Sequence, residues 1–243
     1  MVAHGYVIHT RTFQENKVLI DLLTLEAGLL RTVYRVSKKE AQVLPGPFLR
    51  YELEIAGRGD LKTLKSIEGD GAAIKLEGLY LYSAMYVHEI IEKIVPLNLP
   101  LENMFVLYEW LAQSFEKQLP IAPLLRRFEA ALFDEVGMSI NMGMTATGQF
   151  LTPEQIYQFI PRFGLKPYHG EQLKRVPSLF VSGDLAAAYA NGDWTNKKVL
   201  EMAKMLHRDW LLYLLHGREL NARKLLPVSE YAGEKIGSVP VFR

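Results

Sequence analysis

The 243-residue chain contains no cysteine. Disulfide bonds, thiolate catalysis and every cysteine-ligated zinc or iron–sulfur site are therefore excluded. No window holds 18 consecutive apolar residues, so the sequence predicts no transmembrane helix. The start of the chain lacks a basic segment followed by a long apolar run, which argues against a secretory signal. We therefore expect a cytosolic protein, and the absence of cysteine agrees with a reducing compartment.

Recognisable catalytic motifs are also missing. The chain has no G-x-x-x-x-G-K-[ST] loop, no G-x-G-x-x-G and no G-x-S-x-G. His88-Glu89 begins HEIIE rather than HExxH, so the second zinc-ligating histidine is absent. Glu129, Asp134 and Glu135 lack the spacing of helical neighbours, which is three or four residues, and are expected on a solvated helix face. We expect no enzyme, no cofactor and no metal site.

The net charge is only +1, but it is unevenly distributed. Residues 1–75 have a net charge of +2, residues 76–165 of −5 and residues 166–243 of +4. Solvated surface charge explains this pattern as well as a polyanion-binding site does, so both interpretations stay open. The most informative group is a run of four basic side chains without an acid among them: Arg31, Arg35, Lys38 and Lys39.

The first 70 residues are predicted to form β-structure. Alternation of apolar and polar residues places Arg31 and Arg35 on the face opposite the expected core. The segments Glu26-Ala27-Gly28 and Gly57-Arg58-Gly59-Asp60 are typical of turns between strands. Five short strands predict a small closed barrel, which leaves no exposed sheet edge. The expected strands are at about 4–13, 17–25, 28–36, 48–56 and 61–68.

From about residue 77 the apolar spacing becomes helical. Three helices joined by short links predict a bundle, at 77–95, 101–119 and 123–136. A last long helix is expected over 197–216, with Asn196 as its N-cap and Gly217 as its stop.

Residues 138–196 are less regular. Thr152-Pro153-Glu154-Gln155 matches a capping box and predicts a short helix at 153–160, and Asp184 is a candidate cap for another over 185–190. The predicted fold class is α+β. An OB-type barrel domain would span 1–75, and a helical domain with this irregular, zinc-free insert would span 76–243.

Arg126 and Arg127 are adjacent in the acidic part of the chain and precede Phe128. One interpretation is a helix surface on which the two arginines pair with Glu129 or other nearby acids. The other is a clamp for an anionic peptide beside an apolar groove, a recognition mode that arginine favours. The sequence alone leaves both interpretations open.

Several segments resemble the RecO family of bacterial recombination mediators. They lie in the family's order and span most of the chain. The resemblance implies an N-terminal OB-fold barrel followed by a helical domain, in agreement with the strands and helices expected above. The segments are GYVIHTRTFQENKVLIDLLTLEAGLL near the start, PGPFLRYELEIAGRGDLKTLKSIE at 45–68, GLYLYSAMYVHEIIEKI at 78–94, LLRRFEAALFDEVGM at 124–138 and HGRELNARKLL at 216–226.

The same resemblance implies a function without chemistry. RecO-like proteins bind single- and double-stranded DNA and anneal complementary strands. With RecR they help to load RecA onto single strands coated by the single-stranded DNA-binding protein (SSB), and their helical domain binds the acidic C-terminal tail of SSB. An alternative is a protein-interaction adaptor with weak or no direct DNA binding. A third possibility, an enzyme using carboxylates of the acidic middle, lacks a suitably spaced pair.

The family's basic positions can be carried over to residues of this chain. Arg126 and Arg127 match its L-R-R-F-E segment and are the expected SSB-tail site. Two departures matter: many members carry four zinc-binding cysteines that this chain lacks, and the loop RVSKKEAQV is poorer in basic residues than usual. The expected DNA-binding set, which combines the carried-over positions with the basic run, is Arg31, Arg35, Lys38, Lys39, Lys62, Arg218 and Arg223.

Overall fold

The structure is a computed structural model that describes residues 1–36, 44–170, 179–222 and 241–242. The chain divides into two compact units, which are described separately. The first comprises Met1–Leu119 and takes in residues 220–222, and the second begins at Pro120. The domain boundary proposed at 75/76 marks the change from strands to helices, whereas this division follows packing.

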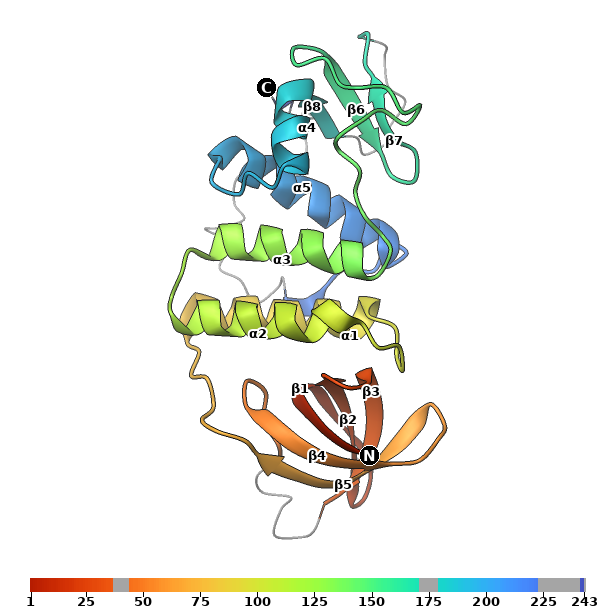
Figure 1. Ribbon diagram of the computed structural model, residues 1–243, viewed down its shortest axis with the longest axis vertical. Helices are drawn as coiled ribbons and strands as arrows, with labels where there is room; N and C mark the ends of the chain where they lie inside the picture. Colours follow the sequence, from red (N-terminus) through yellow and green to blue (C-terminus); the bar gives the residue numbers. More distant parts are fainter. Residues whose placement is uncertain (37–43, 171–178, 223–240, 243) are drawn as a thin grey trace. The chain divides into compact units, whose positions relative to one another are not determined.

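The first unit begins with a closed barrel whose strands are connected in the order β1-β2-β3-β5-β4 (Figure 1). Within the barrel, the β3–β5 pair is parallel, and the β1–β2, β2–β3, β1–β4 and β4–β5 pairs are antiparallel. This is the strand order of an OB-fold, so the α+β prediction with an N-terminal barrel is confirmed. The strands are β1 (Val2–Gln14), β2 (Lys17–Thr24), β3 (Gly28–Arg35), β4 (Arg50–Ala56) and β5 (Leu61–Gly69).

The barrel core follows from the alternation of the strands. Inward positions are apolar and fully buried, as at Ile20, Leu30 and Leu53. The β2–β3 turn ends at Gly28, whose φ of 71° suits glycine. A Cβ at Gly28 would also lie 2.1 Å from the carbonyl oxygen of Leu99, so this turn packs directly against a later loop.

Two helices pack onto the barrel within the same unit: α1 (Gly78–Ile94) and α2 (Glu102–Glu116). Tyr6 of β1 contacts α2, with its ring centroid 5.6 Å from that of Phe105 and 4.9 Å from that of Tyr108. Buried aromatic pairs of this kind contribute beyond the area that they cover. The first unit therefore extends past the last barrel strand because its two helices share a core with β1.

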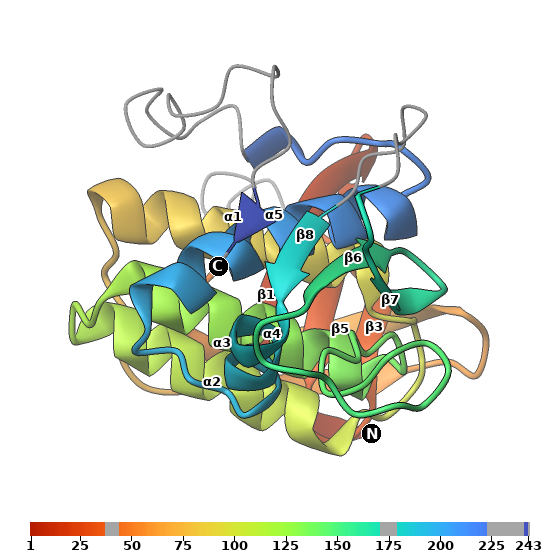
Figure 2. The same ribbon diagram turned by 90° about the horizontal axis from the view of Figure 1, so that it is seen from above.

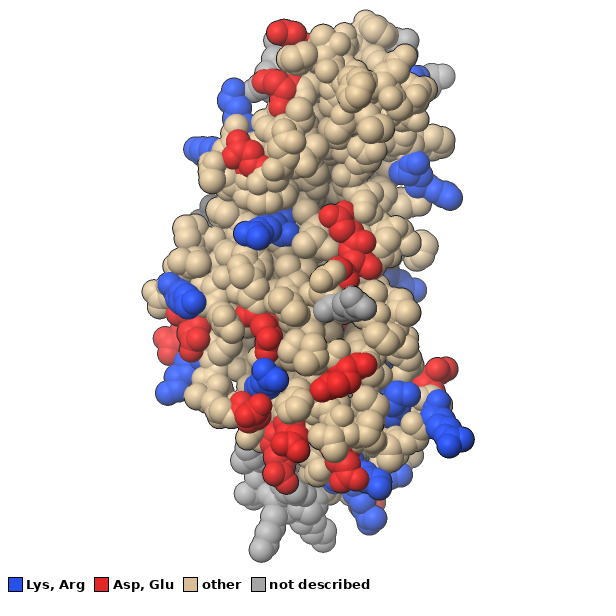
Figure 3. All heavy atoms as spheres, viewed as in Figure 1, with Lys and Arg blue, Asp and Glu red and all other residues tan. Residues whose placement is uncertain are grey.

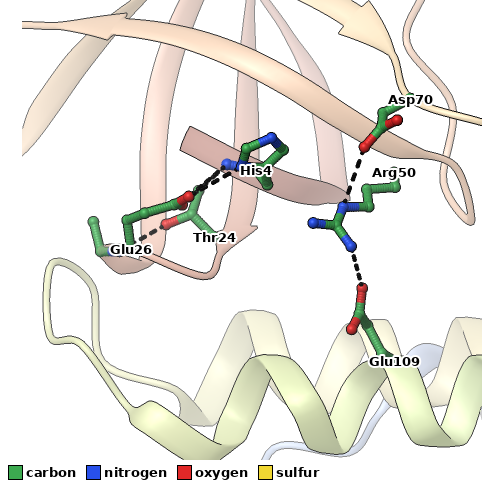
Figure 4. Close-up of polar contacts among 7 residues, drawn as sticks. His4, Thr24, Glu26, Arg50, Asp70 and Glu109 are labelled. Atoms are coloured by element: carbon green, nitrogen blue, oxygen red, sulfur yellow. Dashed lines mark hydrogen bonds and ion pairs between the residues drawn. The ribbon is translucent and has the colours of Figure 1, made fainter. Parts of the chain in front are cut away.

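Polar contacts reinforce this packing (Figure 4). The Arg50 guanidinium lies between two carboxylates, 3.4 Å from Asp70 and 3.3 Å from Glu109 of α2. The hydroxyl of Tyr6 donates to Glu109 at 3.0 Å, and burial raises the pKa of this tyrosine. Arg50 thus connects strand β4 to helix α2.

The second unit combines helices with a small sheet of order β7-β6-β8-β9. Helices α3 and α5 pack against each other, and α4 contacts both α5 and β8. Figure 2 shows β8 between β6 and the short C-terminal strand. The elements are α3 (Ile121–Glu135), β6 (Ile156–Ile160), β7 (Gly164–Pro167), β8 (Leu179–Ser182), α4 (Gly183–Ala190), α5 (Lys197–Leu214) and β9 (Val241–Phe242).

The predicted helix at 153–160 is wrong, because residues 156–160 form strand β6. The segment Ile156-Tyr157-Gln158-Phe159-Ile160 is rich in β-branched and aromatic residues and pairs with β7 on one side and β8 on the other. The expected capping box is instead a turn, in which the N–H of Gln155 donates to the carbonyl of Thr152 at 3.2 Å. Sheet pairing therefore overrides a local helix signal.

The other helix predictions are closer to the structure. Asn196 caps α5 as expected, because its side chain accepts a hydrogen bond from the N–H of Lys198 at 3.0 Å. The helix expected over 185–190 forms, but Ser182 rather than Asp184 is its N-cap residue. No helix in the described part of the chain is long and apolar enough to span a bilayer.

Candidate functional site

Arg31, the first of the expected DNA-binding residues, already binds a carboxylate within the barrel. Its guanidinium donates two hydrogen bonds to Asp21, Nε to Oδ1 at 2.7 Å and Nη2 to Oδ2 at 2.9 Å. The hydrogen bond that Arg31 donates to Asp21 raises the pKa of Arg31, and Asp21 itself is 1% exposed. Because Arg31 completes the hydrogen bonding of a buried carboxylate, much of its charge is neutralised within the protein.

The Arg31–Asp21 pair could have been found in the sequence. The turn at Gly28 pairs Thr24 with Gly28, and counting back along the antiparallel hairpin places Asp21 opposite Arg31. A short turn of known length fixes such a register. Pairing the two strands residue by residue from this turn therefore identifies Asp21 as the partner of Arg31.

Arg35 has a different environment at the far end of β3. Its side chain is exposed, and it lies opposite Lys17 in the β2–β3 register. The β3–β5 pairing ends one residue before Arg35, at Tyr34 and Leu64. The structure therefore places Lys17, a residue that the sequence patterns did not indicate, opposite Arg35.

The remaining expected DNA-binding residues are not gathered with Arg35. Lys62 is half-buried and donates from Nζ to the carbonyl of Gly59 at 3.1 Å, in the β4–β5 turn. Arg218 is exposed and belongs to the second unit. Over the first unit, acidic side chains are interspersed with basic ones on the face shown in Figure 3. Lys38, Lys39 and Arg223 lie outside the described residues.

Another charged cluster lies where β1 and β2 meet α1. His9, Asp21 and Glu92 bring their ligand atoms within 4.8 Å of one another, the only such group of three among the described residues. Arg11 lies 3.8 Å from both carboxylates, and Arg31 binds Asp21 as well. A metal ion there would have to displace guanidinium groups. The arrangement therefore favours a network of ion pairs over a metal site.

In the second unit, Arg126 also binds a buried carboxylate. Its Nη2 donates to Glu129 Oε1 at 2.9 Å, and both side chains are buried. Glu129 is fully buried, so the expectation that it lies on a solvated face is wrong. The reason is tertiary: α5 packs on α3 and brings His207 to within 2.6 Å of Glu129 Oε2.

The network continues through His207 to Tyr189. His207 is fully buried, and burial lowers its pKa, so the ring is neutral. A carboxylate only accepts, so the Nδ1–H of His207 donates to Glu129 and its Nε2 accepts from the Tyr189 hydroxyl at 2.7 Å. Burial also raises the pKa of Tyr189. Arg126, Glu129, His207 and Tyr189 therefore form one enclosed hydrogen-bonded chain, here called the buried network.

A pocket of about 420 Å³ lies beside the buried network. Tyr189 and Trp194 form part of its wall, with ring centroids 5.3 Å apart and an interplanar angle of 83°. Arg127 lines the pocket, whereas Arg126 is not among its lining residues. The two adjacent arginines thus differ: Arg126 is part of the interior and Arg127 is exposed at the pocket. The other residues that line the pocket include Ala130, Ala131, Asp134, Ile140 and Met142.

Comparisons with known proteins agree with the family resemblance. The family model described as "Recombination protein O N terminal" matches residues 1–70, the barrel. The chain is 34% identical over 221 residues to a protein of Stutzerimonas stutzeri (strain A1501) named DNA repair protein RecO, covering 91% of each chain. It is 34% identical to the protein of the same name from Pseudomonas aeruginosa (strain LESB58), covering 90% of this chain and 92% of that one. The corresponding Pseudoalteromonas atlantica protein is 32% identical, over 94% of this chain and 95% of that one.

Proposed function

Because the chain belongs to the RecO family of DNA repair proteins, we propose that it is a recombination mediator that binds single- and double-stranded DNA and anneals complementary strands. With RecR it would help to load RecA onto SSB-coated single strands. The observation that carries the proposal is similarity over about nine-tenths of the chain to proteins named DNA repair protein RecO.

The barrel geometry supports a particular part of its surface for DNA. Lys17 and Arg35 lie opposite each other at the end of the β2–β3 hairpin, and Arg35 is exposed. Phosphate contacts need accessible positive charge more than a special geometry. We therefore rank Arg35, with Lys17, above Arg31 as a DNA contact, because Arg31 is bound to Asp21. Lys38, Lys39, Lys62, Arg218 and Arg223 remain proposed contacts.

The pocket in the second unit is the proposed site for the SSB tail. Arg127 offers a cation beside Ala130, Ala131 and Met142, a combination suited to a peptide that is both anionic and apolar. Arg126 would act as a positioning residue, because its charge holds Glu129 and, through His207, the pocket residue Tyr189.

The test is fluorescence anisotropy of a labelled single-stranded oligonucleotide at several salt concentrations. Wild-type affinity should fall steeply with salt, because counterions are released from the DNA. Lys17→Ala with Arg35→Ala should reduce the slope of log affinity against log salt by about 1.4, or ~0.7 for each phosphate that is no longer neutralised. Arg31→Ala removes a single cation that is bound to a carboxylate, and it should lower the slope by less than ~0.7.

One observation favours the alternative of an adaptor with weak direct DNA binding: Arg31 and Arg126 both have buried carboxylate partners. An SSB-tail peptide in the same assay separates the two functions. The mediator predicts DNA binding and peptide binding, with Arg127→Ala weakening only the peptide. Peptide binding without DNA binding at low salt would favour the adaptor.

A further inference from the structure

The β6–β7 hairpin presents an aromatic side chain at its tip. The turn Pro161-Arg162-Phe163 connects the strands, and the N–H of Phe163 donates to the carbonyl of Ile160 at 3.0 Å. The Phe163 side chain is nevertheless 72% exposed. Arg162 has a φ of 71°, so it adopts the left-handed conformation that side chains usually avoid.

A second exposed aromatic belongs to the same edge of the sheet. Phe150 is 90% exposed and pairs with Met144 through an isolated β-bridge. The segment that carries them is tied to β7, because Thr145 bridges Leu165 and the N–H of Ala146 donates to the carbonyl of Leu165 at 2.8 Å. Backbone hydrogen bonds therefore fix the segments that carry Phe150 and Phe163, while both side chains stay exposed to solvent.

Neither exposed ring is needed to anchor the hairpin. Its core contacts come from Tyr157, Phe159 and Leu165, all of which are buried. The ring centroid of Phe159 lies 6.0 Å from that of Trp210 on α5. The hairpin therefore buries one set of apolar residues and exposes Phe163 in addition.

The charge around Phe163 is positive. Residues 155–170 contain Arg162, Lys166 and His169 but no aspartate or glutamate. Arg162 and Lys166 are exposed, and neither has an ion-pair partner among the residues that the structure describes.

We propose that the β6–β7 hairpin is a contact site for single-stranded nucleic acid, with Phe163 stacking on an unpaired base and Arg162 and Lys166 contacting the flanking phosphates. Exposed aromatics between basic residues suit single strands, since every base offers a stacking face. An acidic peptide could pair with Arg162 and Lys166, but it would offer Phe163 no flat ring to stack on, as a base does. The site lies in the second unit and is additional to the barrel surface. It rests on the proposed DNA-binding function.

The experiment compares full-length variants by anisotropy with a labelled oligothymidine and with a duplex of equal length. Phe163→Ala should weaken binding to the single strand about fivefold or more and leave the salt slope unchanged, because stacking releases no counterions. Phe163→Trp should retain the wild-type affinity. Duplex binding should change less than about twofold, since paired bases are already stacked.

Arg162→Ala with Lys166→Ala should instead reduce the single-strand salt slope by about 1.4. A matched control, Lys117→Ala with Lys197→Ala, removes the same charge from two exposed sites elsewhere. Unchanged single-strand affinity of Phe163→Ala, or equal losses on single strand and duplex, would overturn the hairpin proposal. If Lys17→Ala with Arg35→Ala still weakened binding, the barrel proposal would survive that result. Absence of DNA binding by the wild type at low salt would overturn both.

Discussion

The two units of the molecule each bury a carboxylate that binds an arginine, and they do so to different degrees. Asp21 in the barrel binds Arg31, and Arg11 lies nearby, but both arginines keep about a third of their side chains exposed. Glu129 in the second unit binds Arg126 and His207, and all three are enclosed. The number of basic residues in the sequence is therefore a poor measure of the positive charge that a ligand can reach. How deeply each arginine and its carboxylate partner are buried decides how much of that charge is accessible.

The largest expected effect comes from removing the enclosed carboxylate. Glu129→Ala would leave the Arg126 guanidinium buried without its partner and His207 without its acceptor. Breaking a buried ion pair in this way costs about 3–5 kcal/mol. Asp21→Ala should cost about 1.5–3 kcal/mol, because water can reach the partners. Urea unfolding at neutral pH measures both, and a larger loss for Asp21→Ala would contradict the comparison.

The second prediction concerns pH, because each unit also buries a neutral histidine. Burial lowers the pKa of His88 from 6.5 to about 4 in the first unit, and it lowers the pKa of His207 in the second. As pH falls below 6.5, the unfolded chain binds protons before the folded protein does. The contribution of these neutral histidines to the free energy of unfolding is therefore fully present above pH 6.5 and is lost as the pH falls. For the His88 shift the loss is about 3 kcal/mol.

The variant His88→Gln sharpens this prediction. Glutamine can still hydrogen-bond the Tyr108 hydroxyl, which lies 2.7 Å from Nε2 of His88, but it does not titrate. Between pH 7 and pH 4 the unfolding free energy of the wild type should therefore fall by more than that of the variant. Parallel stability curves for the two proteins would show that His88 does not contribute to the acid sensitivity.

The smallest expected effect is at Arg50, which connects the barrel to α2. Its guanidinium is partly exposed, lies between two carboxylates and is 5.9 Å from the Phe105 ring centroid. Exposed ion pairs contribute about 0.2–1 kcal/mol. A double-mutant cycle of Arg50→Met and Glu109→Gln should give a coupling in this range. A coupling as large as the loss expected for Glu129→Ala would mean that partial exposure does not weaken such pairs.

Much of the fold could be predicted from local sequence patterns. The barrel strands were found because alternation has a period of two, and Gly28 was found because the turn needs a positive φ. The candidate site was predicted less completely. Arg35 and Arg127 are exposed, but the sequence analysis proposed them together with Arg31 and Arg126, and nothing in the local sequence separates the two exposed residues from the two carboxylate-bound ones.

The sequence by itself determined the barrel, the helices, most of their ends and the family, because these depend on periodicity, turn residues and ordered segments. Only the tertiary structure decided that 156–160 joins a sheet, since strand pairing involves residues distant along the chain. It also decided which arginines are enclosed. Glu129 and His207 are 78 residues apart, and they meet only because α5 packs against α3. Burial and partner choice are properties of that packing, which a local pattern does not encode.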